Sequence, residues 1–353
     1  MAKILEKRNV DFAFFYNSDS SRCNPNMFYF CGYKGLGALI IPRDKTPILV
    51  VPEMEFEKAK KSAKGFFRFC KMEKKRFFES IREAVKESKI RANAIAIDKN
   101  NFSLNPFKYF KKQFAKSRII DLSSDCLKLR EIKNDAEINS LKKSCMHADK
   151  ILQKAVCNFK DFKTESDVAA FLEYDTRKLG LETSFNPIVA SGSNGSMPHY
   201  EPSRTKIKRG FCVIDFGVKY NGYCSDITRT IFVGKPSRSE KQMYDLLHSI
   251  QNESIEMANE NLKCSKLYDF VLGRLGRYKA NFTHGLGHGV GVEIHELPNL
   301  TLNSKDRIKN KMVFTIEPGV YFPKRFGIRI EDTILFERKP IALTKTSKDF
   351  IVI

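Results

Sequence analysis

Short apolar runs and longer helical patterns divide the chain into two parts. The first part holds four apolar runs, each typical of a buried strand, at 12–16, 37–42, 47–52 and 93–98. Basic stretches of helical character separate the third run from the fourth. This part predicts an α/β unit.

The pattern changes after residue 126. Apolar residues recur at helical spacing through 127–152, and further helices are expected at about 164–180 and 238–260. Strand-like runs alternate with these helices. We therefore predict a domain boundary near 126 and an α+β second domain, in which helices cover one face of a curved antiparallel sheet.

Five residues with metal-binding side chains lie in separate, distinctive motifs of the second part: Asp215, Asp226, His288, Glu317 and Glu331. Asp215 lies in F-C-V-I-D-F-G and Asp226 in Y-C-S-D-I-T-R-T, and their spacing of eleven residues suits a hairpin. The motifs around Glu317 and Glu331 also predict strands. Any one of these acids alone would more often be a surface residue, but the five together indicate one site.

Four carboxylates in one cleft would repel one another and raise each other's pKa values unless cations lay between them. Two divalent ions relieve that repulsion, and Mn²⁺, Co²⁺ and Zn²⁺ accept mixed oxygen and nitrogen ligands. A metal pair about 3.5–4 Å apart can bind a bridging water, lower its pKa and polarise a scissile carbonyl. The set therefore predicts a dinuclear hydrolase.

In these motifs the sequence resembles the creatinase-like, or pita-bread, metallopeptidases, which include methionine aminopeptidase, aminopeptidase P and prolidase. The resemblance implies that Asp215 binds one metal ion and that His288 and Glu317 bind the other. It also implies that Asp226 and Glu331 bridge the two ions. No ligand position of the family is missing, whereas relatives that are not peptidases have generally lost part of the set.

Three further histidines extend the resemblance. His199, in S-G-S-N-G-S-M-P-H-Y, matches a position near the scissile bond. His295 matches an imidazole that contacts the substrate carbonyl or the tetrahedral intermediate, and His284 matches one that lines the pocket for the residue after the cleaved bond. His147 and His248 lie in helical patterns and are interpreted as structural.

Strand periodicity adds two supporting residues. Arg329 lies two residues before Glu331 and Thr228 two after Asp226, so each pair shares a strand face. The Arg329 guanidinium could brace a ligating carboxylate, and Thr228 could bond a ligand or bridging water. The glycines around His288 lack the G-x-G-x-x-G pattern of a nucleotide loop and indicate close backbone packing.

Nine cysteines without regular spacing do not indicate a disulfide framework and favour a reducing compartment. Cys224 shares the strand face of Asp226, whereas Cys212 is expected in apolar packing. The N-terminus lacks a signal-peptide pattern, and no apolar run approaches the ~20 residues needed to span a bilayer. We therefore expect a cytoplasmic protein.

The net charge of +21 raises the possibility of nucleic-acid binding. The basic residues are scattered, however, in the groups Lys60-Lys61, Lys74-Lys75-Arg76, Lys111-Lys112 and Lys142-Lys143. They are interpreted as solvated faces. The rival hypothesis is a catalytically silent protein of the creatinase fold that uses its basic surface on nucleic acid, protein or acidic lipid.

The resemblance implies a metal-dependent exopeptidase that cleaves Xaa-Pro bonds with two divalent ions per subunit, Mn²⁺ first and Co²⁺ or Zn²⁺ as alternatives. A prolidase acts on dipeptides and must hold the free proline carboxylate, whereas an aminopeptidase P leaves that side open for longer peptides. Lys324 and Arg325 could hold the carboxylate or be ordinary loop residues.

The segment N-M-F-Y-F-C-G-Y at 26–33 resembles the start of creatinase-type N-terminal domains. Residues 1–126 would then be such a domain, and 127–353 the pita-bread catalytic domain. The resemblance further implies a homodimer in which the N-terminal domain excludes long chains.

Overall fold

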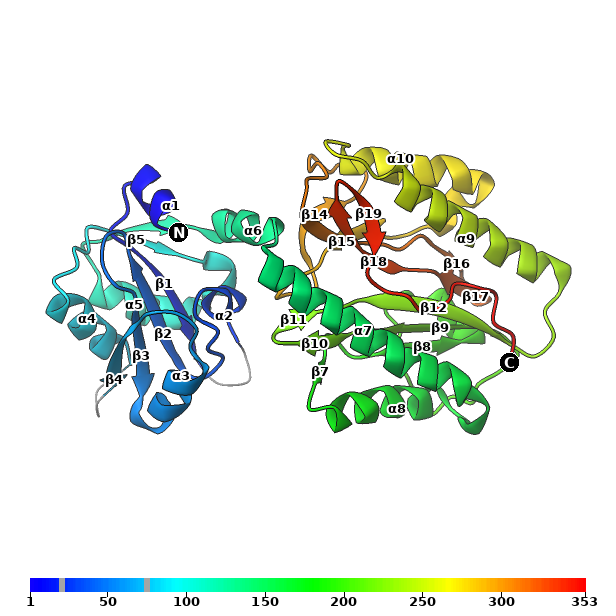
Figure 1. The fold of residues 1–353 in the computed structure, drawn as a ribbon, viewed down its shortest axis with the longest axis horizontal. Helices are drawn as coiled ribbons and strands as arrows, with labels where there is room; N and C mark the ends of the chain where they lie inside the picture. The colour runs from blue at the N-terminus through cyan, green and yellow to red at the C-terminus, as the bar shows by residue number, and fades with distance from the viewer. Residues whose placement is uncertain (19–22, 73–76) are drawn as a thin grey trace. The chain divides into compact units, whose positions relative to one another are not determined.

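The computed structural model of the protein describes residues 1–18, 23–72 and 77–353. The chain forms two compact units, Met1–Leu129 and Arg130–Ile353 (Figure 1). Each unit has its own sheets and its own hydrophobic core. The basic group at residues 74–76 lies outside the described residues.

A six-stranded sheet forms the centre of the first unit, in the order β4-β3-β2-β1-β5-β6. Its strands are β1 Phe12–Asn17, β2 Gly37–Pro42, β3 Ile48–Pro52, β4 Arg68–Met72, β5 Ala94–Ile97 and β6 Arg118–Asp121. The four predicted apolar runs form the inner strands β3, β2, β1 and β5. The edge strands β4 and β6 are partly exposed, so their sequences lack a strong apolar pattern.

Helices cover both faces of this sheet: α1 Ala2–Lys7, α2 Pro25–Cys31, α3 Phe56–Ser62, α4 Phe77–Glu87, α5 Leu104–Gln113 and α6 Ser123–Glu131. Side chains of β1 alternate between the faces. Phe12 and Phe14 pack in the core formed with α4 and α5, whereas Ala13 and Phe15 pack in the core formed with α2 and α3. The first unit is therefore an α/β layer structure, as predicted.

The second unit combines four long helices with short antiparallel strands. The helices are α7 Asp135–Cys157, α8 Glu165–Lys178, α9 Arg238–Met257 and α10 Cys264–Leu275. The first strands are β7 Glu182–Thr183, β8 Ile188–Ser191, β9 Gly210–Phe216, β10 Val218–Tyr220, β11 Tyr223–Cys224 and β12 Ile227–Val233. The later strands are β13 Gly287–Gly289, β14 Glu296–Leu300, β15 Met312–Ile316, β16 Gly319–Phe322, β17 Phe326–Arg329, β18 Asp332–Glu337 and β19 Lys339–Ala342.

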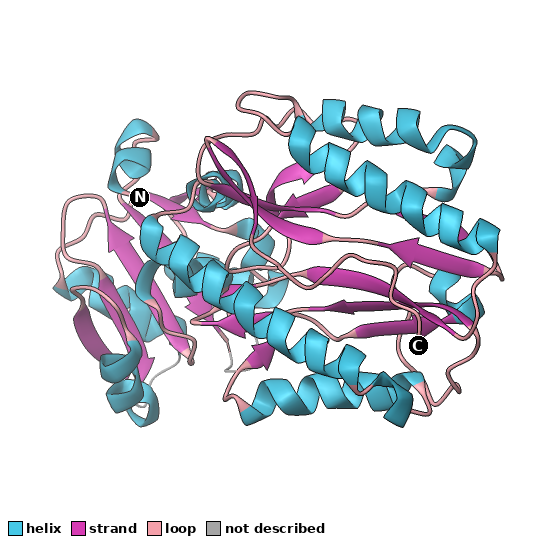
Figure 2. Ribbon diagram, turned by 45° about the vertical axis from the view of Figure 1, so that its right-hand side comes forward, coloured by secondary structure: helices cyan, strands magenta, loops and turns pink. Residues whose placement is uncertain are grey.

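Two helix pairs cover these strands. The buried faces of α7 and α8 pack with β8, β9 and β12, and those of α9 and α10 pack mainly with β15 to β18. Figures 1 and 2 show the pairs outside the strand layer, α7 with α8 on one side and α9 with α10 on the other. Ile214 and Phe216 of β9 face α7 and α8, so the intervening Asp215 points away from them. The predicted α+β class is confirmed, and the described strands of this unit form four antiparallel sheets rather than one.

The helical pattern at 127–152 is not one helix. Helix α6 ends at Glu131 and α7 begins at Asp135. Asn134 caps α7: its side chain accepts bonds from the backbone N–H groups of Ala136 and Glu137, and the Glu137 carboxylate accepts one from the Asn134 N–H. This reciprocal capping box, spelled N-D-A-E, marks a helix start inside the helical pattern.

Candidate functional site

One cavity of about 550 Å³ in the second unit gathers the predicted site residues. Its lining includes the full predicted set: Asp215, Asp226, His288, Glu317, Glu331, His199, His284, His295 and Arg329. Apolar residues, among them Phe185, Pro187 and Ile188, form another part of the wall. The cavity therefore joins a highly polar group to an apolar surface.

The four carboxylates lie at or next to the ends of strands. The strands fix the backbone at these positions, and the side-chain oxygens project into the cavity. Asp215 is inside β9, opposite Thr228 of β12. Asp226 immediately precedes β12, Glu317 immediately follows β15 and Glu331 immediately precedes β18. The expectation that all four project from strands is therefore corrected for three of them. The expected pairing of β9 with β12 is present, with β10 and β11 inserted between them.

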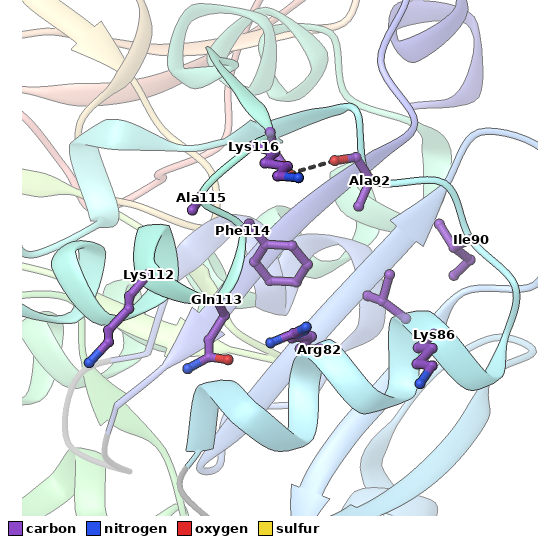
Figure 3. Close-up of a pocket in the computed structure, with 11 residues that line it drawn as sticks. Arg82, Lys86, Ile90, Ala92, Lys112, Gln113, Phe114, Ala115 and Lys116 are labelled. Carbon is purple, nitrogen blue, oxygen red and sulfur yellow. Dashed lines mark hydrogen bonds between the residues drawn. The ribbon is translucent and has the colours of Figure 1, made fainter.

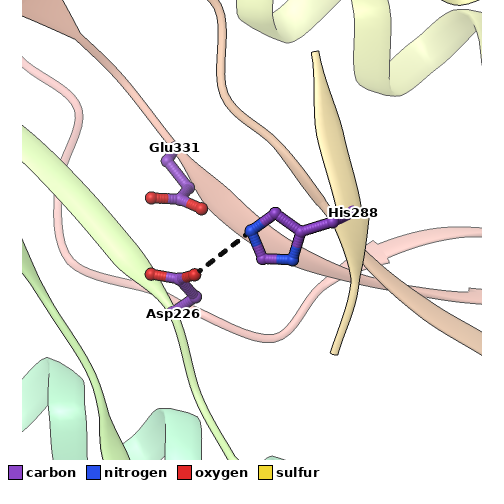
Figure 4. Close-up of side chains that lie close together, drawn as sticks. All are labelled: Asp226, His288 and Glu331. Atoms are coloured by element: carbon purple, nitrogen blue, oxygen red, sulfur yellow. Dashed lines mark ion pairs between the residues drawn. The ribbon is translucent and has the colours of Figure 1, made fainter. Parts of the chain in front are cut away.

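Asp226, His288 and Glu331 converge closely enough to hold one cation (Figure 4). One ligand atom from each lies within 4.8 Å of the others. The Nε2 atom of His288 is 3.6 Å from an Asp226 oxygen and 3.4 Å from a Glu317 oxygen. Four residues from four separate segments of the chain thus lie close together.

The backbone sets the orientation of the His288 ring. Nδ1 lies 3.1 Å from the carbonyl oxygen of Gly289, to which it donates in the tautomer protonated at Nδ1. That tautomer leaves the Nε2 lone pair directed at the carboxylates, as a metal ligand requires. A Cβ atom at Gly287 would overlap the Thr315 carbonyl, and one at Gly289 would overlap the Leu297 carbonyl. The glycines therefore serve close packing, as predicted.

Three buried carboxylate oxygens of the cavity have no hydrogen-bond partner among the described residues. They are Asp215 Oδ1, Asp226 Oδ1 and Glu331 Oε1. A buried charged oxygen without a partner is costly, so such atoms are rare unless an ion or water completes them. Anionic oxygens beside a free imidazole nitrogen are a donor set that fits divalent cations.

The electrostatics of the cavity point the same way. Burial, together with the charges of Glu331, Asp215 and Glu317, raises the pKa of Asp226 well above its usual value. Burial and neighbouring carboxylates likewise raise the pKa of Glu331. Burial lowers the pKa of His288, which favours the neutral ring. The cluster therefore disfavours its own charged form in the absence of a cation.

Arg329 and Thr228 connect the carboxylates behind the cavity. Arg329 Nη2 donates to Asp215 at 2.6 Å, and its Nε donates to the Thr228 hydroxyl at 3.1 Å. Thr228 in turn donates to Glu331 at 2.6 Å. Both residues therefore contact the ligand candidates, although Thr228 touches Glu331 rather than a ligand on its own strand.

Tyr321 completes this network and was missed by the sequence analysis. Arg329 Nη1 donates to its hydroxyl at 2.7 Å, and the hydroxyl lies 2.8 Å from Nε2 of His284. The other nitrogen of His284 lies 2.7 Å from the Gly285 carbonyl. Burial raises the pKa of Tyr321 to about 12, so the phenol is a proton donor at neutral pH. The one signal in the sequence that could have identified Tyr321 is its position in a predicted strand shortly after Pro318-Gly319.

His295 and His199 lie at the cavity with different environments. The ring of His295 meets that of His288 edge to face, with centroids 4.3 Å apart. Burial and His288 lower the pKa of His295, which favours its neutral form. His199 lies in an exposed part of the wall, on the segment after β8.

Comparison with known proteins agrees with this geometry. The family model Metallopeptidase family M24 matches residues 139–338, and the model Creatinase/Prolidase N-terminal domain matches residues 1–132. The chain belongs to metallopeptidase family M24. It is therefore a hydrolase, and its buried Asp226, His288 and Glu331 group is compatible with the divalent metal use of that family.

Relatives of the M24 chain match it over nearly its full length. An Xaa-Pro dipeptidase of Pyrococcus furiosus is 35% identical, over 99% of this chain and 98% of that protein. The crystal structure of a prolidase from Pyrococcus horikoshii has a TM-score of 0.88 at 31% identity and covers 99% of this chain and 98% of its own. That of an X-Pro aminopeptidase from Thermotoga maritima has a TM-score of 0.90 at 28% identity and covers 99% of both chains.

Other residues considered from the sequence lie outside the M24 cavity. Cys224 is buried and its Sγ lies 3.6 Å from the Val292 carbonyl oxygen, while Cys212 packs in the apolar core under α7 and α8. Lys324 and Arg325 occupy the turn between β16 and β17 and do not line the cavity. The Arg325 guanidinium lies over the ring of Phe326, at 5.7 Å.

A second hollow, of about 510 Å³, lies in the first unit beside α4 and α5 (Figure 3). Basic side chains surround it: Arg82, Lys86, Lys112 and Lys116. The described residues of its lining include no carboxylate, histidine or cysteine, so they offer none of the side chains that usually bind divalent metal ions. In residues 1–18, 23–72 and 77–353, no helix is both long and apolar enough to cross a bilayer.

Proposed function

We propose that this M24 protein is a dinuclear-metal-dependent exopeptidase that hydrolyses the Xaa-Pro bond of dipeptides or short peptides, in the manner of a prolidase. The observation that carries the proposal is the convergence of unpartnered, buried carboxylate oxygens with the free Nε2 of His288. Similarity to Xaa-Pro dipeptidases over nearly the whole chain supports the substrate class.

In this proposal five residues hold two divalent ions. Asp215 would hold one ion, His288 and Glu317 would hold the other, and Asp226 and Glu331 would contribute to both. When bound, the ions would supply a water of lowered pKa and polarise the scissile carbonyl. Manganese is the first choice because carboxylate oxygens dominate the set, with cobalt or zinc as alternatives.

The remaining polar residues act on the substrate or on the ligands. The imidazoles of His295 and His199 would bind the substrate carbonyl and the developing oxyanion. Arg329 and Thr228 fix the Asp215 and Glu331 carboxylates by direct hydrogen bonds. Tyr321 keeps His284 in one tautomer by donating to its Nε2 while accepting from Arg329.

An aminopeptidase P activity on longer peptides is the alternative, and one feature of the cavity favours it. Among the described residues of the lining, Arg329 is the only lysine or arginine, and its guanidinium is already bound to Asp215 and Tyr321. The free carboxylate of a dipeptide would therefore lack a spare cation within this unit. A longer peptide, whose proline carbonyl is neutral, would not need one.

The decisive experiment compares Xaa-Pro with Xaa-Pro-Xaa on the purified protein after chelation and reconstitution with Mn²⁺, Co²⁺ or Zn²⁺. We expect metal-dependent release of the N-terminal residue, with an Xaa-Ala peptide as the matched control for proline. Activity on the dipeptide alone identifies a prolidase, and activity on the tripeptide alone an aminopeptidase P. Absence of metal-dependent hydrolysis of both would refute the proposal.

The first unit would limit the length of the substrate and contribute to a homodimer, in a cytoplasmic protein. Nine free cysteines support a reducing compartment. The rival hypothesis, a silent binding module, predicts salt-sensitive nucleic-acid binding without hydrolysis. A filter-binding titration with salt tests it, because phosphate contacts lose affinity steeply as salt rises.

A further inference from the structure

A group of buried charges lies outside the cavity and has no part in the proposed chemistry. The side chains of Arg130, Lys133 and Glu296 are each only 1% exposed. Glu293 completes the group and is 39% exposed. Arg130 lies in the last turn of α6, and Lys133 lies in the short connection between α6 and α7.

The cations bind the chain segment that joins β13 to β14. Lys133 Nζ donates to Glu296 Oε2 at 3.0 Å, and Arg130 Nε is 3.5 Å from the other oxygen of the same carboxylate. Arg130 also forms an ion pair with Glu293. Two positive and two negative side chains thus form a neutral cluster, which we call the Glu296 cluster.

The joined segment, residues 290–295, has no regular secondary structure and contacts the Glu296 carboxylate at Gly291 and Glu293. The Glu293 N–H donates to Glu296 Oε1 at 3.1 Å. A Cβ atom at Gly291 would overlap the same carboxylate. Because residues 290–295 form no strand, few ladder hydrogen bonds fix their backbone. The contacts with the Glu296 carboxylate are therefore important for the conformation of this segment.

The same segment carries His295, the residue directly before Glu296. The His295 ring packs edge to face on His288, with centroids 4.3 Å apart. A displacement of the segment would therefore move one imidazole directly and remove the other's packing partner. Misplacement of a catalytic group by about 1 Å can cost ~10²-fold in rate.

Buried ion pairs add little net stability, because desolvation offsets most of their attraction and apolar replacements are often as stable. Such pairs instead provide geometric specificity, because the ammonium and guanidinium groups hold the carboxylate in one position and one orientation. We propose that Arg130 and Lys133 are positioning residues, which act through Glu296 to place His295 and the ring of His288. This inference rests on the proposed function, in which both imidazoles serve hydrolysis of the peptide.

The helix connection offers a matched control. Lys311 forms an ion pair with Asp135 at 2.6 Å, and Asp135 is 86% exposed. This pair also holds the start of α7, but neither partner contacts residues 290–296 through a hydrogen bond or ion pair. Lys311→Gln therefore removes a charge from the same region without removing a contact of the Glu296 cluster.

The test compares Lys133→Met and Glu296→Gln with Lys311→Gln in the full-length, metal-loaded protein. We expect the first two to lower kcat about 10- to 100-fold, the range found when a partner that orients a ligand is removed. KM and the metal content should change little, and hydrogen exchange of the peptide that contains 290–296 should accelerate. The loss in the Lys133→Met/Glu296→Gln double variant should be smaller than the two single losses combined, because both changes break the contact between Lys133 and Glu296.

Wild-type kcat and wild-type exchange in folded Lys133→Met would overturn the inference, as would a lower melting temperature with unchanged kcat. If Lys133→Met does not fold, Glu293→Gln removes the exposed member of the cluster, and unchanged exchange and kcat in that variant would overturn the inference equally. Exchange is measured independently of activity. A wild-type protein without peptidase activity would therefore refute the proposed function, while the exchange data would still judge the positioning role.

Discussion

At the scale of single residues, the site depends on buried carboxylate oxygens of Asp215, Asp226 and Glu331 that accept no hydrogen bond from the described residues. In the proposed centre Asp226 and Glu331 each hold both ions. We expect Asp226→Asn and Glu331→Gln to abolish turnover and to lower bound metal while the protein stays folded, because an amide is a weak, neutral ligand. Metal analysis and activity of the same sample provide the measurement. Two bound ions with near-normal turnover would contradict the bridging assignment.

The raised pKa of Asp226 predicts an effect on stability in the metal-free protein. Burial and neighbouring carboxylates raise this pKa well above the usual 3.8, so the folded protein keeps a proton that the unfolded chain releases. Stability contributed by that proton is lost as pH rises above 3.8 toward the raised value. We expect chelated Asp226→Asn to be more stable than the chelated wild type at neutral pH, with the difference shrinking on acidification. Denaturant titrations across pH measure it, and a pH-independent difference would be inconsistent.

The two histidines assigned to the substrate predict a different phenotype. His199→Ala and His295→Ala should retain metal but lose turnover, by ~10²–10³ if each supplies a donor to the developing oxyanion. His248→Ala, on α9 and outside the cavity lining, is the control. Poor metal binding by either variant would place that histidine among the ligands instead.

At the scale of secondary-structure elements, α8 positions the segment that carries His199. Glu165, at the first turn of α8, is fully buried. Its carboxylate accepts bonds from the Ser191 backbone N–H at 2.8 Å, the Asn194 amide at 3.0 Å and the Tyr200 hydroxyl at 2.8 Å. One helix terminus thus fixes the path of the chain from the end of β8 to Tyr200.

Replacing this acceptor should loosen that path. We expect Glu165→Gln to cost about 1–3 kcal/mol in the free energy of unfolding, since a buried donor loses its partner. Turnover should also fall, because His199 lies on the loosened segment. Glu173→Gln, on the exposed side of α8, is the matched control. Urea denaturation and steady-state kinetics test both effects, and wild-type values for Glu165→Gln would exclude an organising role.

At the scale of the whole molecule, the five ligand candidates all belong to the second unit, while the first contains none of them. We expect a 127–353 fragment to keep metal binding, because it retains those ligands together with Arg130 and Lys133. It should lose efficiency and discrimination by peptide length if the first unit restricts access. Activity on a series of Xaa-Pro peptides of increasing length measures this. Identical length profiles for fragment and full chain would exclude that role.

The sequence alone was sufficient for the broad organisation. Buried strands such as β1, β2 and β3 have continuous apolar runs, and the strand-end motifs around Asp215 and Glu331 combine β-branched residues with an isolated acid. These local patterns arise because each strand must bury apolar side chains regardless of which other strands it pairs with. They predicted the α/β first unit, the α+β second unit and residues that line a single cavity.

Other features depend on contacts between distant segments. Tyr321 gains its role from Arg329 and His284, and the Glu296 cluster joins residues more than 160 positions apart, since Lys133 and Glu296 are separated by 163. Local patterns also failed at the break between α6 and α7, where the Asn134 cap competes with helical spacing. The sequence determined which segments form helices and strands, because burial acts on each segment alone. The tertiary structure decided which polar groups share a partner, because that depends on where separate segments meet.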